Sequence, residues 1–256
     1  MRKIKRFVLL LCTCLALNGC GGDTGGNENP VTNTELYVLM YHSVAADGAL
    51  CGEWTVTEST FRAHMNWLTA HGYTSVLPSE LAAGDPLPER AVLITFDDGY
   101  TDNCTRAVPI LQETGHKAVV SIVTSYMDVR PEFMTWEQVR QVADSGVMEI
   151  GSYTHDLHRY PGLQRLEGES REDYEARAFA DLEESIRLIE EYTGYKPVLI
   201  AYPHGIVDEW VEDFCNAHFP VTLYGVGSVN DIRDGLQGLE RWNINEETDL
   251  SAYLPE

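Results

Sequence analysis

AVLITFDDGY, residues 91–100, is the stretch of this sequence that decides the fold. Its first six residues are almost all apolar, and the run stops abruptly at Asp97, Asp98 and Gly99, which predicts a buried strand followed by a sharp turn. A buried strand that carries two carboxylates at its carboxyl end is how α/β folds place their functional sites. Asp-Gly is also ordinary turn chemistry, so a solvated turn is the alternative.

Strands and helices alternate along the rest of the chain, which predicts a parallel sheet in an α/β fold, specifically a single distorted or partial (β/α) barrel. Residues 81–88 are predicted to form a loop. Glycines follow several amphipathic segments, and a capping box opens the one that begins at Thr135. The predicted strands are 35–40, 73–77, 91–96, 117–123, 147–151, 198–202 and 220–226, and the predicted helices are 57–71, 102–114, 135–145, 171–192 and 208–218.

The N-terminus differs from the rest. Four basic residues precede an apolar run that is too short to span a bilayer, which is typical of a secretory signal. The run ends in Leu-Asn-Gly-Cys at Cys20, which resembles the lipobox of bacterial lipoproteins. We therefore expect a lipoprotein signal peptide over 1–19, a flexible tether over 20–34 and one domain over 35–256. The resemblance implies that the protein is exported and anchored to the cell membrane by lipid on Cys20.

The net charge limits the kinds of binding partner, and the cysteine count limits the number of disulfides. The chain has 40 acidic and 18 basic residues, a net charge of −22. Such a surface repels nucleic acid and anionic lipid, and it suits a neutral partner or a cationic one such as an amino sugar polymer. We expect no nucleic acid and no obligate protein partner. Cys51, Cys104 and Cys215 allow at most one disulfide, which we do not assign.

Four predicted strand ends carry residues suited to catalysis. They are His42, the pair Asp97 and Asp98, the cluster 153–158 with His155 and His158, and the segment 202–205. A carboxylate and imidazoles can bind a divalent metal that activates water. A second carboxylate can accept the proton of that water, and an opposite imidazole can protonate a leaving group. This pattern predicts metal-assisted hydrolysis of a carbonyl compound.

From about Glu35 to the C-terminus the chain resembles the polysaccharide deacetylases of the NodB-homology type, carbohydrate esterase family four. Thr95-Phe96-Asp97-Asp98-Gly99 matches the first motif of that family, which implies that Asp97 is the general base and Asp98 a metal ligand. Met40-Tyr41-His42 resembles the N-terminal motif of the permuted branch that includes exopolysaccharide N-deacetylases, where the histidine is the general acid.

Two further motifs extend the resemblance. Glu149-Ile150-Gly151-Ser152 leads into the second motif, whose second metal-binding histidine matches His158. Ala201-Tyr202-Pro203-His204-Gly205 is similar to the third motif of exported members. The segment around Arg241 resembles one whose arginine orients the catalytic aspartate. The resemblance thus implies substrate-binding roles for Tyr202, Pro203, His204 and Gly205. Tyr100, Trp136 and Tyr202 are candidates for stacking on sugars.

One position departs from the family pattern. Related exported chains read Ser-His-Thr-Tyr-Asp-Leu-His, whereas this chain reads Ser152-Tyr153-Thr154-His155-Asp156-Leu157-His158. Tyr153 therefore stands where the first metal histidine belongs, and a phenol with a reference pKa of about 10 is a poor ligand. If the strand conformation continues, His155 points to the same face as Tyr153 and replaces the missing ligand. Otherwise the metal site is impaired.

The resulting hypothesis is a metal-dependent hydrolase, with zinc as the metal, that removes N-acetyl groups from the amino sugars of an N-acetylated polysaccharide. Asp97 is the base, His42 the acid, and a backbone N–H near His204 helps to hold the oxyanion. Two alternatives remain: a glycan-binding pseudoenzyme whose metal site is impaired by Tyr153, and an esterase that removes O-acetyl groups from a glycan.

Overall fold

The structure is a computed structural model that describes residues 33–256. The expected signal peptide, Cys20 and nearly all of the tether lie outside the described residues. The described residues, 33–256, form one compact unit. No helix within 33–256 is both long enough and apolar enough to cross a membrane.

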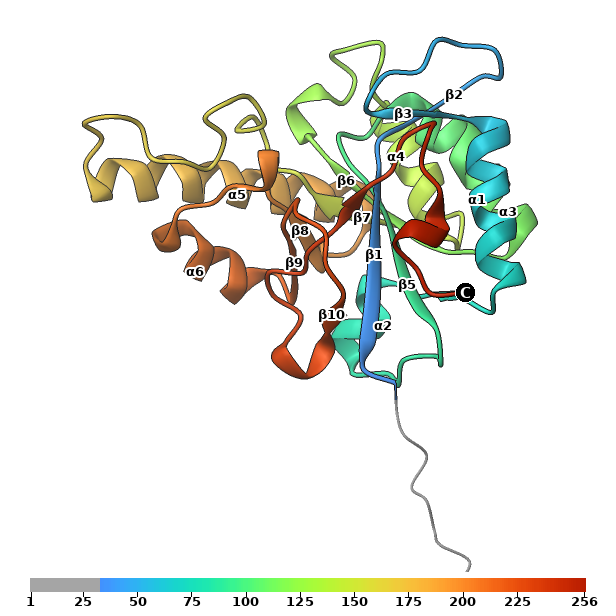
Figure 1. The fold of residues 1–256 in the computed structure, drawn as a ribbon. Coiled ribbons are helices and arrows are strands. Elements are labelled where there is room, and N and C mark those ends of the chain that lie inside the picture. Colours follow the sequence, from blue (N-terminus) through green and yellow to red (C-terminus); the bar gives the residue numbers. More distant parts are fainter. Residues whose placement is uncertain (1–32) are drawn as a thin grey trace, which may run out of the picture. The chain divides into compact units, whose positions relative to one another are not determined.

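A curled, mainly parallel sheet forms the centre of the domain, as predicted (Figure 1). Its strands follow the order β10-β1-β5-β6-β7-β8-β9, and β10 alone along this path runs antiparallel to its neighbour. The short β4 pairs with the start of β5, and β11 pairs with β1. The strands are β1 (Glu35–Tyr41), β4 (Thr74–Ser75), β5 (Ala91–Phe96), β6 (Ala118–Ile122), β7 (Met148–Ser152), β8 (Leu199–Ala201), β9 (Val221–Leu223), β10 (Asn230–Asp231) and β11 (Trp242–Asn243).

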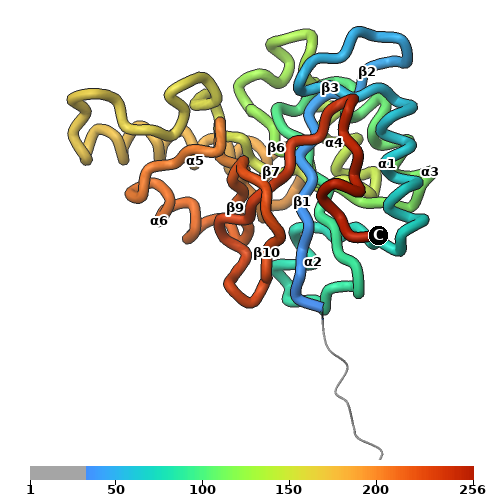
Figure 2. The backbone as a smooth tube through the Cα atoms, viewed as in Figure 1, coloured from blue at the N-terminus to red at the C-terminus, as the bar shows by residue number. Residues whose placement is uncertain are grey.

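A C-terminal segment connects the two ends of this curled sheet. Leu239 exchanges backbone hydrogen bonds with β9, and Trp242 and Asn243 run parallel to β1. Figure 2 shows this late part of the chain crossing beside β1. Arg241 lies between the two attachment points, so its side chain can reach the interior that the sheet encloses.

Helices pack around the sheet, and a small parallel pair, β2 (Ser43–Ala45) and β3 (Thr55–Thr57), lies beyond the carboxyl end of β1 (Figure 1). The helix α1 packs against α3, and α5 contacts both α4 and α6. A π-helical turn, Asn103–Ala107, precedes α3. The helices are α1 (Glu58–Ala70), α2 (Pro78–Ala83), α3 (Val108–Thr114), α4 (Trp136–Ala143), α5 (Arg171–Thr193) and α6 (Glu209–His218).

Most local expectations hold, with one correction. The capping box of α4 is present, because Thr135 accepts a hydrogen bond from the Gln138 backbone N–H and the Gln138 side chain accepts one from Thr135. The segment predicted as the loop 81–88 instead begins inside α2. Pro78 at the helix start and the side chain of Glu80, which accepts a hydrogen bond from the Leu77 N–H, stabilise that short helix.

The stretch 91–100 decides the fold as expected. Every residue of β5 is fully buried between β1 and β6. The two carboxylates that follow are buried as well, because Asp97 is 1% exposed and Asp98 is 8% exposed. A solvated turn is therefore excluded. Unpaired buried carboxylates are costly, so their surroundings indicate what they do.

Candidate active site

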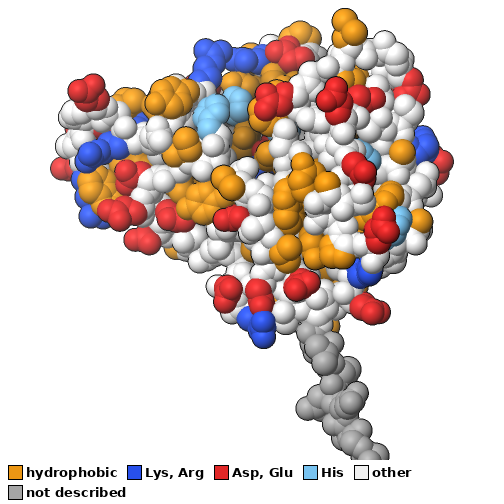
Figure 3. Space-filling model, viewed as in Figure 1, with side chains coloured by type: hydrophobic (Ala, Val, Ile, Leu, Met, Phe, Trp, Pro, Cys, Tyr) orange, Lys and Arg blue, Asp and Glu red, His pale blue; other side chains and the backbone are white. Residues whose placement is uncertain are grey.

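The carboxyl ends of four parallel strands converge on one cavity of about 370 Å³. His42 follows β1, Asp98 follows β5, Tyr153 follows β7, and His204 follows β8. In Figure 3, histidine side chains gather at the surface of the face drawn, with hydrophobic, basic and acidic side chains around them. The cavity is lined by Met40, His42, Trp54, Asp98, Tyr100, Tyr153, His158, His204, Gly205, Gly225 and Arg241.

Arg241 holds Asp97 in a fixed orientation. Its two terminal nitrogens donate to the two carboxylate oxygens at 2.7 and 2.9 Å. The remaining Arg241 nitrogen donates to the Tyr224 carbonyl at 2.7 Å, and both partners of the ion pair are 1% exposed. A buried bidentate pair of this kind fixes geometry and balances the carboxylate charge. Arg241 and Asp97 are therefore brought together as the sequence pattern suggested.

Asp98 and Gly99 form the turn that aims the carboxylates at the cavity. Both have left-handed backbone conformations, with φ of 74° and 85°. A Cβ at Gly99 would lie 2.8 Å from Cγ2 of Ile122, so the turn requires a glycine there. Within residues 33–256, the Oδ1 atom of Asp98 has no hydrogen-bond partner. Burial raises the pKa of Asp98 to about 6.

His158 approaches Asp98 from the second motif. Its Nε2 lies 3.7 Å from Oδ1 of Asp98, and its Nδ1 finds no hydrogen-bond partner in the described chain. Burial, followed by the neighbouring His204, lowers the pKa of His158 to about 4. The ring is therefore neutral near pH 7 and has a lone pair available for a cation.

His42 lies on another side of the cavity. It is buried, its carbonyl accepts a hydrogen bond from the Asn103 side chain at 2.7 Å, and its Nδ1 is without a partner in the part of the chain that the structure describes. Burial lowers the pKa of His42, while the charges of Asp97 and Asp98 oppose this effect. His42 therefore lines the same cavity as Asp98, and the Asp97 carboxylate is close enough to influence its charge.

Tyr153 occupies the cavity and His155 does not. The strand β7 ends at Ser152, and Thr154 has a φ of 72°, so the strand conformation on which the ligand role of His155 depended does not continue to residue 155. The chain turns there, and Nδ1 of His155 pairs with the Thr124 hydroxyl at 2.9 Å. The structure does not bring His155 to the cavity as a ligand.

The phenol of Tyr153 lies against the catalytic groups. Its ring centre is 5.1 Å from that of His158, and the side chain is 5% exposed. Burial and the nearby charges of Asp97 and Asp98 raise the pKa of Tyr153 well above its ordinary value. The hydroxyl therefore remains protonated at neutral pH and is a poor ligand for a cation.

The residues present do not fit a metal centre with three protein ligands. Asp98 and His158 offer one oxygen and one nitrogen close together, with unpartnered polar atoms. The third position is filled by the protonated Tyr153. Across residues 33–256 there is no group of three or more His, Cys, Asp or Glu side chains placed to hold one ion.

The candidate substrate-binding residues divide into two groups. His204, Gly205 and Tyr100 line the cavity. The ring of Tyr202 is fully buried against α6, and Pro203 is also buried, so the expected stacking of Tyr202 on a sugar is wrong. Tyr202 directly follows β8, and its side chain packs with residues of α5 and α6 rather than lining the cavity.

Trp136 is also placed differently from the expectation, and Trp54 was missed. Trp136 stacks on Tyr192 with ring centres 4.2 Å apart, which removes it from a role with sugars. Trp54 lines the cavity beside His42. It lies in an irregular segment before β3, where no periodicity or motif marks it.

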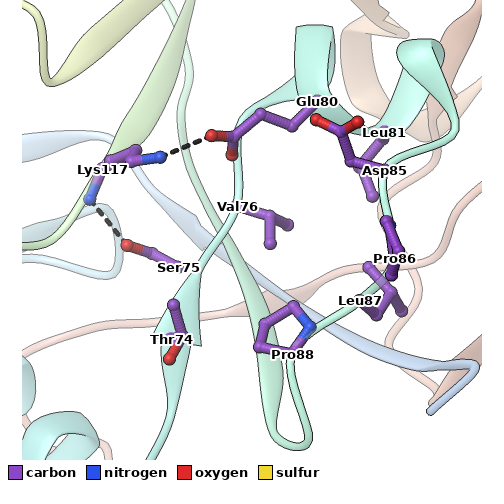
Figure 4. A pocket seen from close by; sticks show the side chains of 10 residues that line it. All are labelled: Thr74, Ser75, Val76, Glu80, Leu81, Asp85, Pro86, Leu87, Pro88 and Lys117. Carbon is purple, nitrogen blue, oxygen red and sulfur yellow. Dashed lines mark hydrogen bonds and ion pairs between the residues drawn. The ribbon is translucent and has the colours of Figure 1, made fainter. Parts of the chain in front are cut away.

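A second cavity, of about 300 Å³, lies near the amino end of β5 (Figure 4). Its polar groups pair with each other, because the Lys117 side chain binds Glu80 and the Lys117 backbone N–H donates to the Ser75 hydroxyl at 2.6 Å. This cavity contains none of the motif residues, whereas the cavity at the carboxyl ends of the strands collects several of them and is therefore the candidate active site.

Comparison with known proteins identifies the family of this chain. Residues 84–218 match the polysaccharide deacetylase family. The chain resembles a de-N-acetylase structure from Aggregatibacter actinomycetemcomitans, with a TM-score of 0.73 and 27% identity over 85% of this chain and 97% of that one. This chain therefore belongs to the polysaccharide deacetylase family and is a hydrolase of that family.

Two curated relatives are similar over different lengths. YxkH of Bacillus subtilis strain 168, provisionally named a polysaccharide deacetylase, is 28% identical over 82% of this chain and 81% of its own length. The poly-β-1,6-N-acetyl-D-glucosamine N-deacetylase of Escherichia coli K12 is 30% identical over 62% of this chain, but the match spans only 28% of that enzyme. Members of the family are generally metal-dependent.

Proposed function

We propose that this protein hydrolyses N-acetyl groups on the amino sugars of a polysaccharide such as poly-β-1,6-N-acetylglucosamine. The observation that carries the proposal is the Asp97 carboxylate, fixed by Arg241 at the carboxyl end of β5, beside the cavity that His42 lines. The resemblance to de-N-acetylases supports an amide as the bond that is cleaved.

The chain's own residues account for the proton transfers. Asp97 accepts a proton from a water that attacks the acetamide carbonyl, and His42 donates a proton to the departing nitrogen. The lowered pKa of His42 means that its protonated form gives up that proton readily. The products are acetate and a free amine. Arg241 keeps Asp97 oriented and is a positioning residue.

A divalent cation such as zinc would polarise the carbonyl and lower the pKa of its bound water. In this chain it would have only Asp98 and His158 as protein ligands, and we infer that Tyr153 makes the site weak. The presence of Tyr153 where the family has a ligand histidine favours a second candidate function, in which the protein binds acetylated glycan without hydrolysing it. We also propose, from the sequence pattern around Cys20, that the protein is an exported lipoprotein.

The test measures free amine, released acetate and metal content together. We expect the full chain to release equal amounts of acetate and amine from acetylated poly-β-1,6-glucosamine in the presence of zinc, and Asp97→Asn to abolish that release without unfolding. Acetate release confined to O-acetylated xylan would replace the proposal with an esterase. Binding of the polymer with no acetate release, at any zinc concentration up to the millimolar range, would favour the glycan-binding function.

A further inference from the structure

Trp54 is held at the mouth of the active-site cavity, beside His42. The centres of the two rings are 4.7 Å apart and their planes are tilted by 53°. The Ser43 backbone N–H donates to the Trp54 carbonyl at 3.1 Å, which ties Trp54 to the residue that follows His42. The Asn243 side chain also reaches the Glu53 carbonyl. The position of Trp54 therefore depends on the strands that carry the site.

This tryptophan is unusually exposed for its kind. Trp54 is 46% exposed, whereas Trp136 is covered by Tyr192 and Trp242 stacks on Tyr37. Tryptophan is enriched at binding surfaces, where its apolar body packs on a partner and its N–H stays in water. Trp54 is itself one of the residues that line the cavity, so it lies in the candidate site rather than alone on the surface.

The location of Trp54 beside His42 fits the sugar ring that carries the reacting acetamide. In the proposed reaction His42 protonates the nitrogen that leaves the carbonyl, and that nitrogen is bonded directly to a sugar ring. The ring must therefore lie next to His42, which is where Trp54 is. A pyranose presents C–H groups on its face and hydroxyls at its edge, so it can pack on indole while its hydroxyls stay in water.

We propose that Trp54 is the platform on which the sugar ring bearing the reacting acetamide stacks, and that it selects a pyranosyl substrate. This inference rests on the proposed function for the identity of the reacting group. Stacking is made equally in the ground state and the transition state, so it affects KM rather than kcat.

The test compares Trp54→Ala and Trp54→Phe with a matched control, Leu50→Ala. Leu50 lies in the same segment and is fully exposed, but it does not line the cavity. We expect Trp54→Ala to raise KM for an N-acetylglucosamine oligomer about tenfold, since a stacking contact of about 1.4 kcal/mol is tenfold in affinity. Trp54→Phe should retain most of the affinity, and Leu50→Ala should match the original protein.

Two outcomes would overturn the inference. An unchanged KM in Trp54→Ala would show that the sugar lies elsewhere. A fall in kcat with a shifted pH profile and an unchanged KM would show that Trp54 only positions His42. Calorimetric binding of the same oligomer separates this inference from the proposed function: if the protein binds but does not hydrolyse, loss of binding in Trp54→Ala still supports the platform.

Discussion

Replacing Tyr153 by histidine should convert the cavity into a metal centre with three protein ligands. The Tyr153 backbone N–H donates to the Ile122 carbonyl at 2.9 Å, and this bond fixes the direction of the side chain whatever residue is present. An imidazole there would lie beside His158 and Asp98, whose facing atoms are 3.7 Å apart. The substitution also removes the protonated hydroxyl that lies near Asp97.

The expected gain in affinity can be worked from the ligand count. Structural zinc sites with four ligands bind with about 10–16 kcal/mol, or about 2.5–4 kcal/mol per ligand. One added imidazole should therefore tighten zinc binding by roughly a hundredfold to a thousandfold. We expect the lower end, because the smaller ring leaves part of the Tyr153 volume unfilled and the ligand less firmly held.

Titration calorimetry with zinc, and absorption spectra with cobalt, would measure this change directly. Tyr153→Phe is the matched control, since it removes the same hydroxyl but adds no ligand, and it should leave zinc affinity near that of the original protein. Adding His158→Ala to the Tyr153→His variant should cancel the gain. Acetate release should rise with metal occupancy in the Tyr153→His variant.

The reasoning would fail if the original protein already held one zinc at nanomolar affinity and lost it in His155→Ala. That result would mean that His155 moves into the cavity and completes the site. An unchanged zinc affinity in the Tyr153→His variant, with the fold intact, would place the cation away from Asp98 and His158.

Three further changes test other parts of the structure. With metal removed by chelation, Asp98→Asn should raise the free energy of unfolding above pH 6 but not below pH 4, because the pKa of Asp98 rises from 3.8 to about 6 on folding. The buried charge of Asp98 costs about 3 kcal/mol at most. Thermal unfolding of both proteins at pH 8 and at pH 4 would show the difference. Arg241→Met leaves the buried carboxylate it binds unpaired, and denaturant titration should show a loss of about 3–5 kcal/mol together with the loss of activity; a variant of normal stability would contradict the ion-pair argument. Gly99→Ala should lower the midpoint of thermal unfolding more than Gly48→Ala, because both glycines have positive φ but an added Cβ meets Ile122 only at Gly99. An equal fall in the midpoint for both variants would show that backbone conformation alone sets the loss of stability.

The sequence predicted the central strands of the sheet well because these strands are buried on both faces, whereas the partly buried β10 and β11 were not predicted. Continuous apolar runs such as β1 and β5 have few alternative structures, and the carboxylates at the end of β5 stop the run sharply. The same pattern located His42, Asp97 and Asp98 at strand ends, where a parallel sheet brings them together. Local sequence was enough for these positions.

Local sequence was not enough where a single backbone angle or a contact with a distant segment determines the position of a side chain. The positive φ at Thr154 turns the chain and separates Tyr153 from His155, and no residue type there signals the turn, because threonine rarely adopts that conformation. Trp54 reaches the cavity through a hydrogen bond between Ser43 and its own carbonyl, within an irregular segment. Tertiary contacts determined both the turn at Thr154 and the position of Trp54.

The two adjacent carboxylates have different surroundings, and this contrast supports the different roles that we propose for them. Arg241 neutralises Asp97 through two hydrogen bonds, so that carboxylate is fixed in place with its charge already balanced. Asp98 shares the burial but forms no ion pair with an arginine or lysine; its Oδ1 lies 3.7 Å from Nε2 of the neutral His158 and finds no hydrogen-bond partner within residues 33–256. A buried carboxylate without a counter-charge costs stability, and such a cost is retained in a fold when the group acts on something else. Asp97 is therefore suited to move a proton repeatedly from one geometry, and Asp98 to attract positive charge into the cavity.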